Sequence, residues 1–126
     1  MLFRSVSQSR YDDTGVLATQ NGMTGIAKAW VYYKGTATVG IQGSFNVSSV
    51  TYNSVGVYTI NITTALPNAN YAVVTGISGF GSGGSIAIVD DPSVSTYSTT
   101  QFTVRSRANT GAAATDDYIH VAVFSS

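Results

Sequence analysis

The sequence has no cysteine and no glutamate, and charged residues of both signs are scarce. The lack of cysteine excludes disulfides, thiolate catalysis and cysteine metal sites. Charged residues make up 10% of the chain, against roughly 25% in an ordinary soluble domain. The formal net charge is zero, so no broad basic field exists to attract nucleic acid or anionic lipid. We therefore expect no nucleic-acid partner.

Long apolar runs and familiar catalytic motifs are also missing. No apolar stretch approaches the about 20 residues of a membrane-spanning helix, which predicts no membrane insertion. The first ten residues lack the apolar centre of a signal peptide. No Walker, Rossmann, nucleophile-elbow or zinc-ligand pattern occurs. We predict that the protein is not an enzyme and that it uses no cofactor and no metal.

Period-two alternation of apolar and polar residues is the main structural signal. In Val57–Thr63, Tyr58, Ile60 and Ile62 alternate with polar residues, which is typical of a half-buried strand. Tyr52–Gly56, with its Asn and Gly, is expected to form a hairpin loop before it. A strand over Thr38–Gln42 is expected to end at Gly43.

About eight such strands, with turn residues between them, predict an all-β fold. No segment shows a capped helical stripe of apolar residues. The length of 126 residues suits one domain. We predict an antiparallel, jelly-roll-like β-sandwich of about eight strands over residues 26–126. Residues 1–25 are interpreted as an N-terminal arm or neck, and the alternative is a loosely ordered end clipped from a longer protein.

The acidic residues come as three adjacent aspartate pairs: Asp12-Asp13, Asp90-Asp91 and Asp116-Asp117. One interpretation is a set of carboxylates gathered for glycoside hydrolysis or for Ca²⁺. However, adjacent residues in a strand point to opposite faces, so a pair rarely aims both groups at one target. The favoured interpretation is that each pair marks a turn or strand end, where aspartate bonds to local backbone.

Two strands have apolar residues on both faces, namely Ile26–Lys34 and Tyr118–Phe124. An antiparallel sheet usually exposes one face to water, so a two-sided apolar strand suggests a second burial partner. We therefore predict subunit contacts at Trp30, Tyr32, Tyr118 and His120. His120 is the only histidine and would need Ser and Asp to converge on it to form a catalytic triad.

Eight tyrosines, five phenylalanines and one tryptophan give the chain large contact surfaces with few charges. Tyrosine provides a rigid ring with a polar tip, which suits contacts with sugars and protein surfaces. Four predicted loops or irregular segments are the candidate recognition surfaces: Tyr52–Gly56, Gly79–Ser85, Ser93–Ser98 and Ala108–Thr115. Within them the candidate binding residues are Tyr52, Asn53, Phe80, Ser82, Tyr97 and Asn109. For the aromatic residues, the alternative is packing over the ends of the sandwich.

Four short segments, in this order, are shared with a known group of proteins: AKAWV at Ala27–Val31, SFNVSS at Ser44–Ser49, the Tyr58–Thr64 strand and PNANYAV at Pro67–Val73. With them, Gly25–Ser126 resembles the C-terminal receptor-binding domain of bacteriophage tail fibres. The resemblance implies a homotrimer in the virion tail, joined to other phage tail proteins through its N terminus. It also implies adhesion to a bacterial surface glycan or outer-membrane protein, strengthened by the several copies in one head.

Two other classes of function remain open from the sequence. A structural virion protein, such as a capsid decoration or tail accessory, would explain the low charge and the two-sided strands equally well. A depolymerase would require two aspartate pairs beside an elongated groove, and we do not expect glycan cleavage.

Overall fold

The computed structural model describes residues 25–78, 86–89, 97–108, 110, 112, 113 and 118–125. Within these residues the chain is entirely β-structure, turns and irregular segments, with no helix. The predicted arm lies outside the described residues, except for Gly25. The eight strands are β1 Ala27–Lys34, β2 Gly40–Phe45, β3 Val47–Ser54, β4 Val57–Ile62, β5 Ala72–Ser78, β6 Ile86–Val89, β7 Gln101–Arg107 and β8 Tyr118–Phe124.

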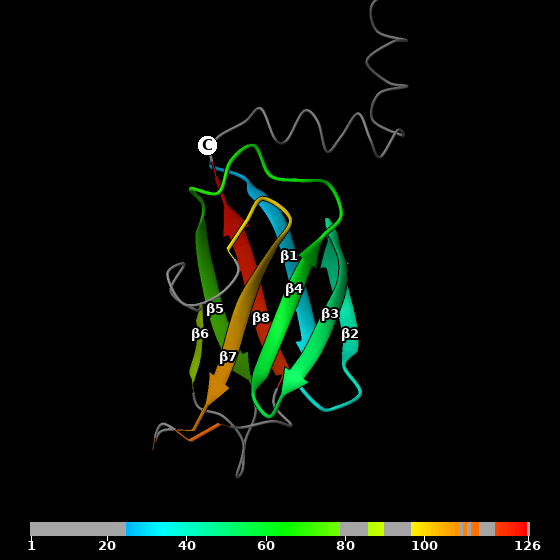
Figure 1. Cartoon of the computed structure of the whole chain (residues 1–126), viewed down its shortest axis with the longest axis vertical. Helices are drawn as coiled ribbons and strands as arrows, with labels where there is room; N and C mark the ends of the chain where they lie inside the picture. The colour runs from blue at the N-terminus through cyan, green and yellow to red at the C-terminus, as the bar shows by residue number, and fades with distance from the viewer. Residues whose placement is uncertain are drawn as a thin grey trace, which may run out of the picture.

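The strands form two four-stranded sheets that pack face to face (Figure 1). Sheet A has the order β2-β1-β8-β5, and sheet B has the order β3-β4-β7-β6. Every pairing is antiparallel, and β1 and β8 lie side by side in the centre of sheet A. The predicted antiparallel β-sandwich of about eight strands is therefore confirmed.

The core lies between the sheets and follows the predicted alternation. In β4, every second side chain is buried, and Tyr58 and Ile60 are completely inaccessible to solvent. In β1 the inward residues are Ala29, Val31 and Tyr33, so the alternate residues of this strand face outward. Burying an aliphatic core side chain contributes about 1.5–3 kcal/mol relative to leaving it exposed. The inner faces of both sheets therefore supply most of the stabilising burial.

A single residue, Asn46, turns the chain from sheet A into sheet B. Asn46 has a φ of 56°, in the left-handed region that asparagine tolerates better than most residues. Its side-chain amide donates to the carbonyls of Lys28 and Thr64, at 3.0 Å each, and its side-chain oxygen accepts from the Thr64 N–H at 2.7 Å. The predicted break at Gly43 was wrong, because Gly43 lies inside β2 and the chain changes sheets at Asn46.

The β3–β4 hairpin is tighter than predicted. β3 continues to Ser54, which pairs with Val57, so the connection is Val55–Gly56. Gly56 has a φ of 69°, a conformation that glycine adopts without strain. The predicted loop from Tyr52 was wrong for its first three residues, which belong to β3. The pairing register of β3 and β4 shifts between Tyr52 and Ser54, so β3 has one more residue than β4 at this point.

The two ends of the sandwich differ in what they carry. At the end where β1 begins, Ala27 and Ala72 both pair with Phe124. We call this the entry end, because the preceding segment of the chain joins the sandwich there. At the opposite end, the far end, Tyr118 pairs with Lys34 and Ser78. The β3–β4 turn and the C-terminal end of β7 also lie at the far end, at the bottom of the view in Figure 1.

The far end of the core is closed by a hydrogen bond from the Tyr58 hydroxyl to the Gly35 carbonyl. A Cβ at position 35 would lie 2.5 Å from that hydroxyl oxygen and 2.9 Å from the ring carbon that carries it. Because Tyr58 is fully buried and in edge contact with Tyr33, its ring has little room to move away.

We therefore expect Gly35→Ala to lower the free energy of unfolding by about 2 kcal/mol, a typical cost of overpacking a core. Denaturant titration followed by circular dichroism would measure this loss. Gly40→Ala is the matched control, since its Cβ would meet the flexible end of Gln42 at 3.4 Å and the Cβ of Lys34 at 3.9 Å, an ordinary van der Waals contact. Equal stability of the two variants would contradict the proposed role of Gly35.

Tyr33 gives a second expectation for the core. Its hydroxyl is buried and has no hydrogen-bond partner among the described residues. An unsatisfied buried polar group costs about 1–3 kcal/mol, so Tyr33→Phe should raise the free energy of unfolding by about 1 kcal/mol. Thermal and denaturant unfolding at neutral pH would measure the gain. No gain, or a loss, would mean that the hydroxyl is satisfied.

The pH dependence of stability provides a further measurement on the same variant. Burial, and secondarily the neighbouring Tyr58, raise the pKa of Tyr33 far above its ordinary value of 10.0. The unfolded chain therefore loses this proton first, so stability is retained below about pH 10 and falls above it, by up to about 1.4 kcal/mol per pH unit. Tyr33→Phe should make this alkaline loss shallower than in the parent protein.

Candidate functional site on the outer face of sheet A

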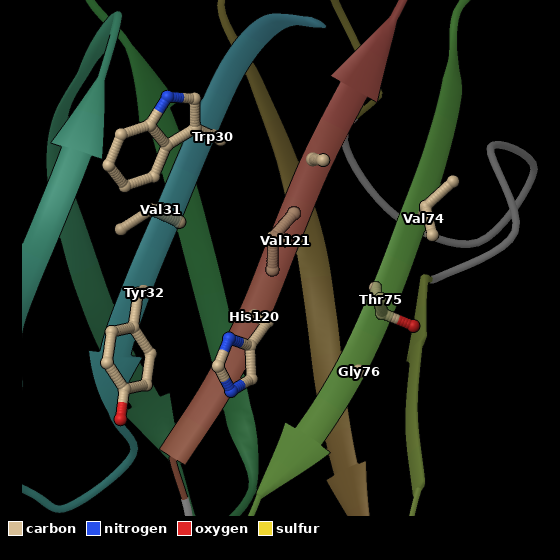
Figure 2. Close-up of a pocket in the computed structure, with 9 residues that line it drawn as sticks. Trp30, Val31, Tyr32, Val74, Thr75, Gly76, His120 and Val121 are labelled. Atoms are coloured by element: carbon tan, nitrogen blue, oxygen red, sulfur yellow. The ribbon is translucent and has the colours of Figure 1, made fainter.

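Sheet A presents an outer face that is rich in aromatic and small side chains (Figure 2). The strand register places these residues in rows across β1, β8 and β5. Trp30, Ala122 and Val74 form one row; Tyr32, His120 and Gly76 form the next; Lys34, Tyr118 and Ser78 form the third. Trp30 is 41% exposed and Val74 is 59% exposed, so this face leaves large apolar groups in contact with water.

An aromatic cluster occupies the half of this face nearer the far end. The Tyr32 and His120 rings are stacked, with centroids 4.4 Å apart, and Tyr118 lies 5.6 Å from Tyr32. The Lys34 Nζ lies 5.8 Å from the Tyr118 ring centroid, within the range of a cation–π contact. The Ser78 Oγ and His120 Nε2 are 3.0 Å apart. These contacts fix the orientation of the imidazole on the face.

All four predicted subunit-contact residues lie on this one face. Trp30 and Tyr32 come from β1, and Tyr118 and His120 come from the neighbouring strand β8. Sequence reasoning placed them on two-sided strands, and the register brings them together. Their role in subunit contacts stays a prediction.

A shallow hollow of about 460 Å³ lies beside Trp30. The indole leans toward β2, where a Cβ on Gly43 would lie only 3.3 Å from the ring. The neighbouring positions in the hollow are Ala122 and Gly76, which carry the two smallest kinds of side chain, and Val74 lies on the opposite side. The hollow thus arises where small residues sit between larger ones. Its lining is mostly apolar, and Tyr32, Thr75 and His120 add side chains with polar atoms.

The outer face of sheet B has the opposite character. Thr51, Thr59 and Thr103 are directly opposite one another across three strands. The side-chain amide of Asn61 donates to the hydroxyls of Ser49, at 3.0 Å, and Thr51, at 3.1 Å. The side chains of Ser49, Thr51 and Asn61 thus form a hydrogen-bonded polar ladder on β3 and β4, while Thr103 on β7 is buried.

Among the described residues, the groups on the aromatic face assemble neither a triad nor a metal site. Ser78 converges on His120, but all six aspartates fall outside the described residues. Within the part of the chain that the structure describes, no group of three or more potential metal ligands occurs. The Ser78–His120 contact joins β5 to β8.

Tyr52 does not have the position predicted for it in a loop. It lies in β3, is half-buried and packs against the core, and its ring makes an edge contact with Tyr58 at 6.0 Å between centroids. Asn53 is also in β3, where it is exposed and its side-chain amide donates to the Thr59 hydroxyl at 2.7 Å. The prediction of an exposed aromatic tip at Tyr52 was wrong, because the strand is longer than its sequence indicates.

Tyr97 caps the core at the entry end instead of projecting from a tip. Its ring stacks on Tyr71 with centroids 4.5 Å apart, and its hydroxyl donates to the Tyr71 carbonyl at 2.7 Å. Burial raises the pKa of both hydroxyls above the ordinary tyrosine value, and the neighbouring Tyr97 contributes further to the shift at Tyr71. Packing over the end of the sandwich, the stated alternative for this residue, is the observed arrangement.

The other predicted recognition residues, Phe80, Ser82 and Asn109, lie outside the described residues. Sequence reasoning also missed several features of the site. The hollow depends on Gly76 and Ala122 being diagonal neighbours in adjacent rows of β5 and β8, which only the register reveals. The sequence signal that could have indicated the hollow was a small residue at each of these two positions, in strands that are otherwise mostly apolar.

Comparisons with known proteins leave the family of this chain unassigned. No protein-family model, curated protein or solved structure matches it. In the described part of the chain, no helix has the length and apolar character needed to cross a bilayer.

We expect Tyr97→Phe to lower the free energy of unfolding by about 1 kcal/mol, because it removes the hydrogen bond to the Tyr71 carbonyl. Denaturant titration would measure this loss, with Tyr118→Phe as a control on a half-buried tyrosine of the outer face. Unchanged stability of Tyr97→Phe would contradict the capping role of this hydroxyl.

Proposed function

We propose that this protein is the head of a bacteriophage tail fibre, which adheres to the bacterial surface as a homotrimer. The observation that carries the proposal is the contrast between the two outer faces of the sandwich. Sheet B offers water a hydrogen-bonded polar ladder, whereas sheet A leaves Trp30 and Val74 exposed. A sandwich with one polar and one apolar outer face is suited to be a subunit of an assembly. Four segments of the sequence resemble tail-fibre heads, and this resemblance is why we propose a tail fibre as the assembly.

The arrangement of strand ends supports recognition at the far end. A stalk connected through residues preceding β1 would join at the entry end. The β3–β4 turn lies at the far end, where Val55 is 51% exposed. Strands β5 and β7 both end at the far end. The predicted loop Gly79–Ser85 follows β5, and the predicted loop Ala108–Thr115 follows β7. Tyr97 lies at the entry end, so we leave it out of the proposed recognition surface.

The proposed mechanism is multivalent adhesion. Each head would offer the same weak contact three times, to a glycan or an outer-membrane protein repeated on one cell. Linked weak contacts raise avidity by about 10²–10⁴-fold without any new interaction. A rigid sandwich suits this role, because its turns keep their relative positions between encounters.

The test is binding of the fluorescently labelled protein to intact bacteria and to a glycan array. We expect Val55→Asp to weaken cell binding about tenfold without changing the Tm, because the charge would disturb a contact at the far end. Thr63→Asp is the matched control, since Thr63 is also exposed but follows β4 at the entry end.

Two outcomes would contradict the proposal. Equal loss of binding in both variants would remove the far end as the recognition surface. Absence of binding to every cell and glycan, together with labelling of the capsid by antibodies against the protein, would favour the structural virion role. Labelling at the tip of a tail fibre would support the proposed role.

A further inference from the structure

The aromatic cluster near the far end differs from the rest of the outer face of sheet A, because it also carries polar atoms. Tyr32, Tyr118 and Lys34 are half-buried, and Ser78 and His120 are exposed. The register sets His120 beside Tyr32 in one row, and Tyr118 between Lys34 and Ser78 in the next. Such rows are about 7 Å apart along a strand, and neighbouring strands are about 5 Å apart. The cluster therefore covers an area comparable with that of a sugar ring.

Two tyrosine hydroxyls of the cluster are open to a ligand. The hydroxyls of Tyr32 and Tyr118 make no hydrogen bond to the residues that the structure describes. Figure 2 shows the Tyr32 hydroxyl pointing along β1 toward the far end, with the His120 ring beside it. The cluster therefore offers ring faces together with groups that can donate or accept hydrogen bonds.

Lys34 adds a positive charge that no described carboxylate balances. Its Nζ lies 5.8 Å from the Tyr118 ring centroid, and it has no ion pair within the described part of the chain. All six aspartates lie outside the described residues. An ammonium group beside an aromatic ring, with polar groups around it, is complementary to a ligand that carries a negative charge.

The combined chemistry of the cluster matches an acidic sugar. The C–H groups on one face of a sugar ring are apolar and can pack on an aromatic ring, while its hydroxyls need polar partners. An extended peptide would find no unpaired backbone here, because β1 and β8 are the central strands of sheet A. A membrane surface would need several cations, whereas the cluster contains a single lysine.

We propose that the aromatic cluster binds a sugar that carries a carboxylate, with the sugar ring against Tyr118 and the carboxylate at the Lys34 Nζ. The Tyr32 hydroxyl, the Ser78 hydroxyl and the His120 imidazole would bond to hydroxyls of the same sugar. This inference rests on the proposed function only for its biological role, since the cluster lies toward the far end. It requires this half of the face to remain open to solvent in the assembly.

The experiment presents the full chain with an array of oligosaccharides that contain uronic or nonulosonic acids, each beside its carboxyl-reduced form. We expect binding to acidic sugars at least tenfold tighter than to their reduced forms. The binding should also weaken as salt is added, because the charge pair would be exposed. Isothermal titration with the tightest sugar and with its reduced form would then give the two dissociation constants.

The first variant, Lys34→Met, removes the charge and keeps a long side chain against Tyr118. It should weaken binding of the acidic sugar about tenfold and leave the reduced form almost unaffected, because it removes a hydrogen bond to a charged group. Arg107→Met is the matched control, since Arg107 ends β7 and removes the same charge from the other sheet. Equal weakening in both variants would indicate general attraction by charge and would overturn the site.

A second pair of variants tests the ring. Tyr118→Ser should weaken binding of both the acidic and the reduced sugar about tenfold, because the packing surface is lost. Tyr118→Phe keeps the ring and should retain most of the binding. A Tm of Tyr118→Ser close to that of the parent would show that the loss does not come from unfolding. Equal binding by Tyr118→Ser and the parent would contradict the proposed packing.

The remaining outcomes separate this site from the proposed adhesion. Absence of binding to every acidic sugar, or equal binding to acidic and reduced forms, would overturn the inference. If cells are still bound and Val55→Asp alone weakens that binding, the cluster is rejected and the proposed function stands. Binding of an acidic sugar that depends on Lys34, in a protein that adheres to no cell, would uphold the site and reject adhesion.

Discussion

The antiparallel pairing of β1 with β8 determines how this protein meets its surroundings. These two central strands of sheet A carry apolar residues on both faces, and burying one face necessarily turns the other outward. Val31, Tyr33 and Ile119 fill the core, so the alternate residues of the same strands must lie outside. The aromatic outer face is thus a direct result of the strand period and cannot be removed by repacking the monomer.

The polar outer face of sheet B shows that the chain can build a solvated sheet where one is needed. There, asparagine and threonine side chains bond to one another across β3 and β4. The residue types at the outward positions therefore determine that the outer face of sheet B is polar and that of sheet A is apolar.

The sequence predicts local alternation better than it predicts long-range position. The strand predicted over Tyr118–Phe124 coincides with β8, and the alternation predicted in Val57–Thr63 is the burial pattern of β4. The corner at Asn46 was missed, because its hydrogen-bond partners Lys28 and Thr64 are each 18 residues away. Tyr52 was misplaced for a related reason, since its contact with Tyr58 forms only when the two strands pair. The register shows that Trp30, Tyr32, Tyr118 and His120 share one outer face, and the hollow beside them also needed the register of three strands.

The corner at Asn46 also bears on how the molecule comes apart. Its one carboxamide bonds to the β1 backbone in sheet A and to the backbone beyond β4 in sheet B. Neither sheet can loosen without disturbing the other, because both depend on the same side chain. The sandwich should therefore lose its structure in one cooperative transition, with no stage at which a single sheet survives.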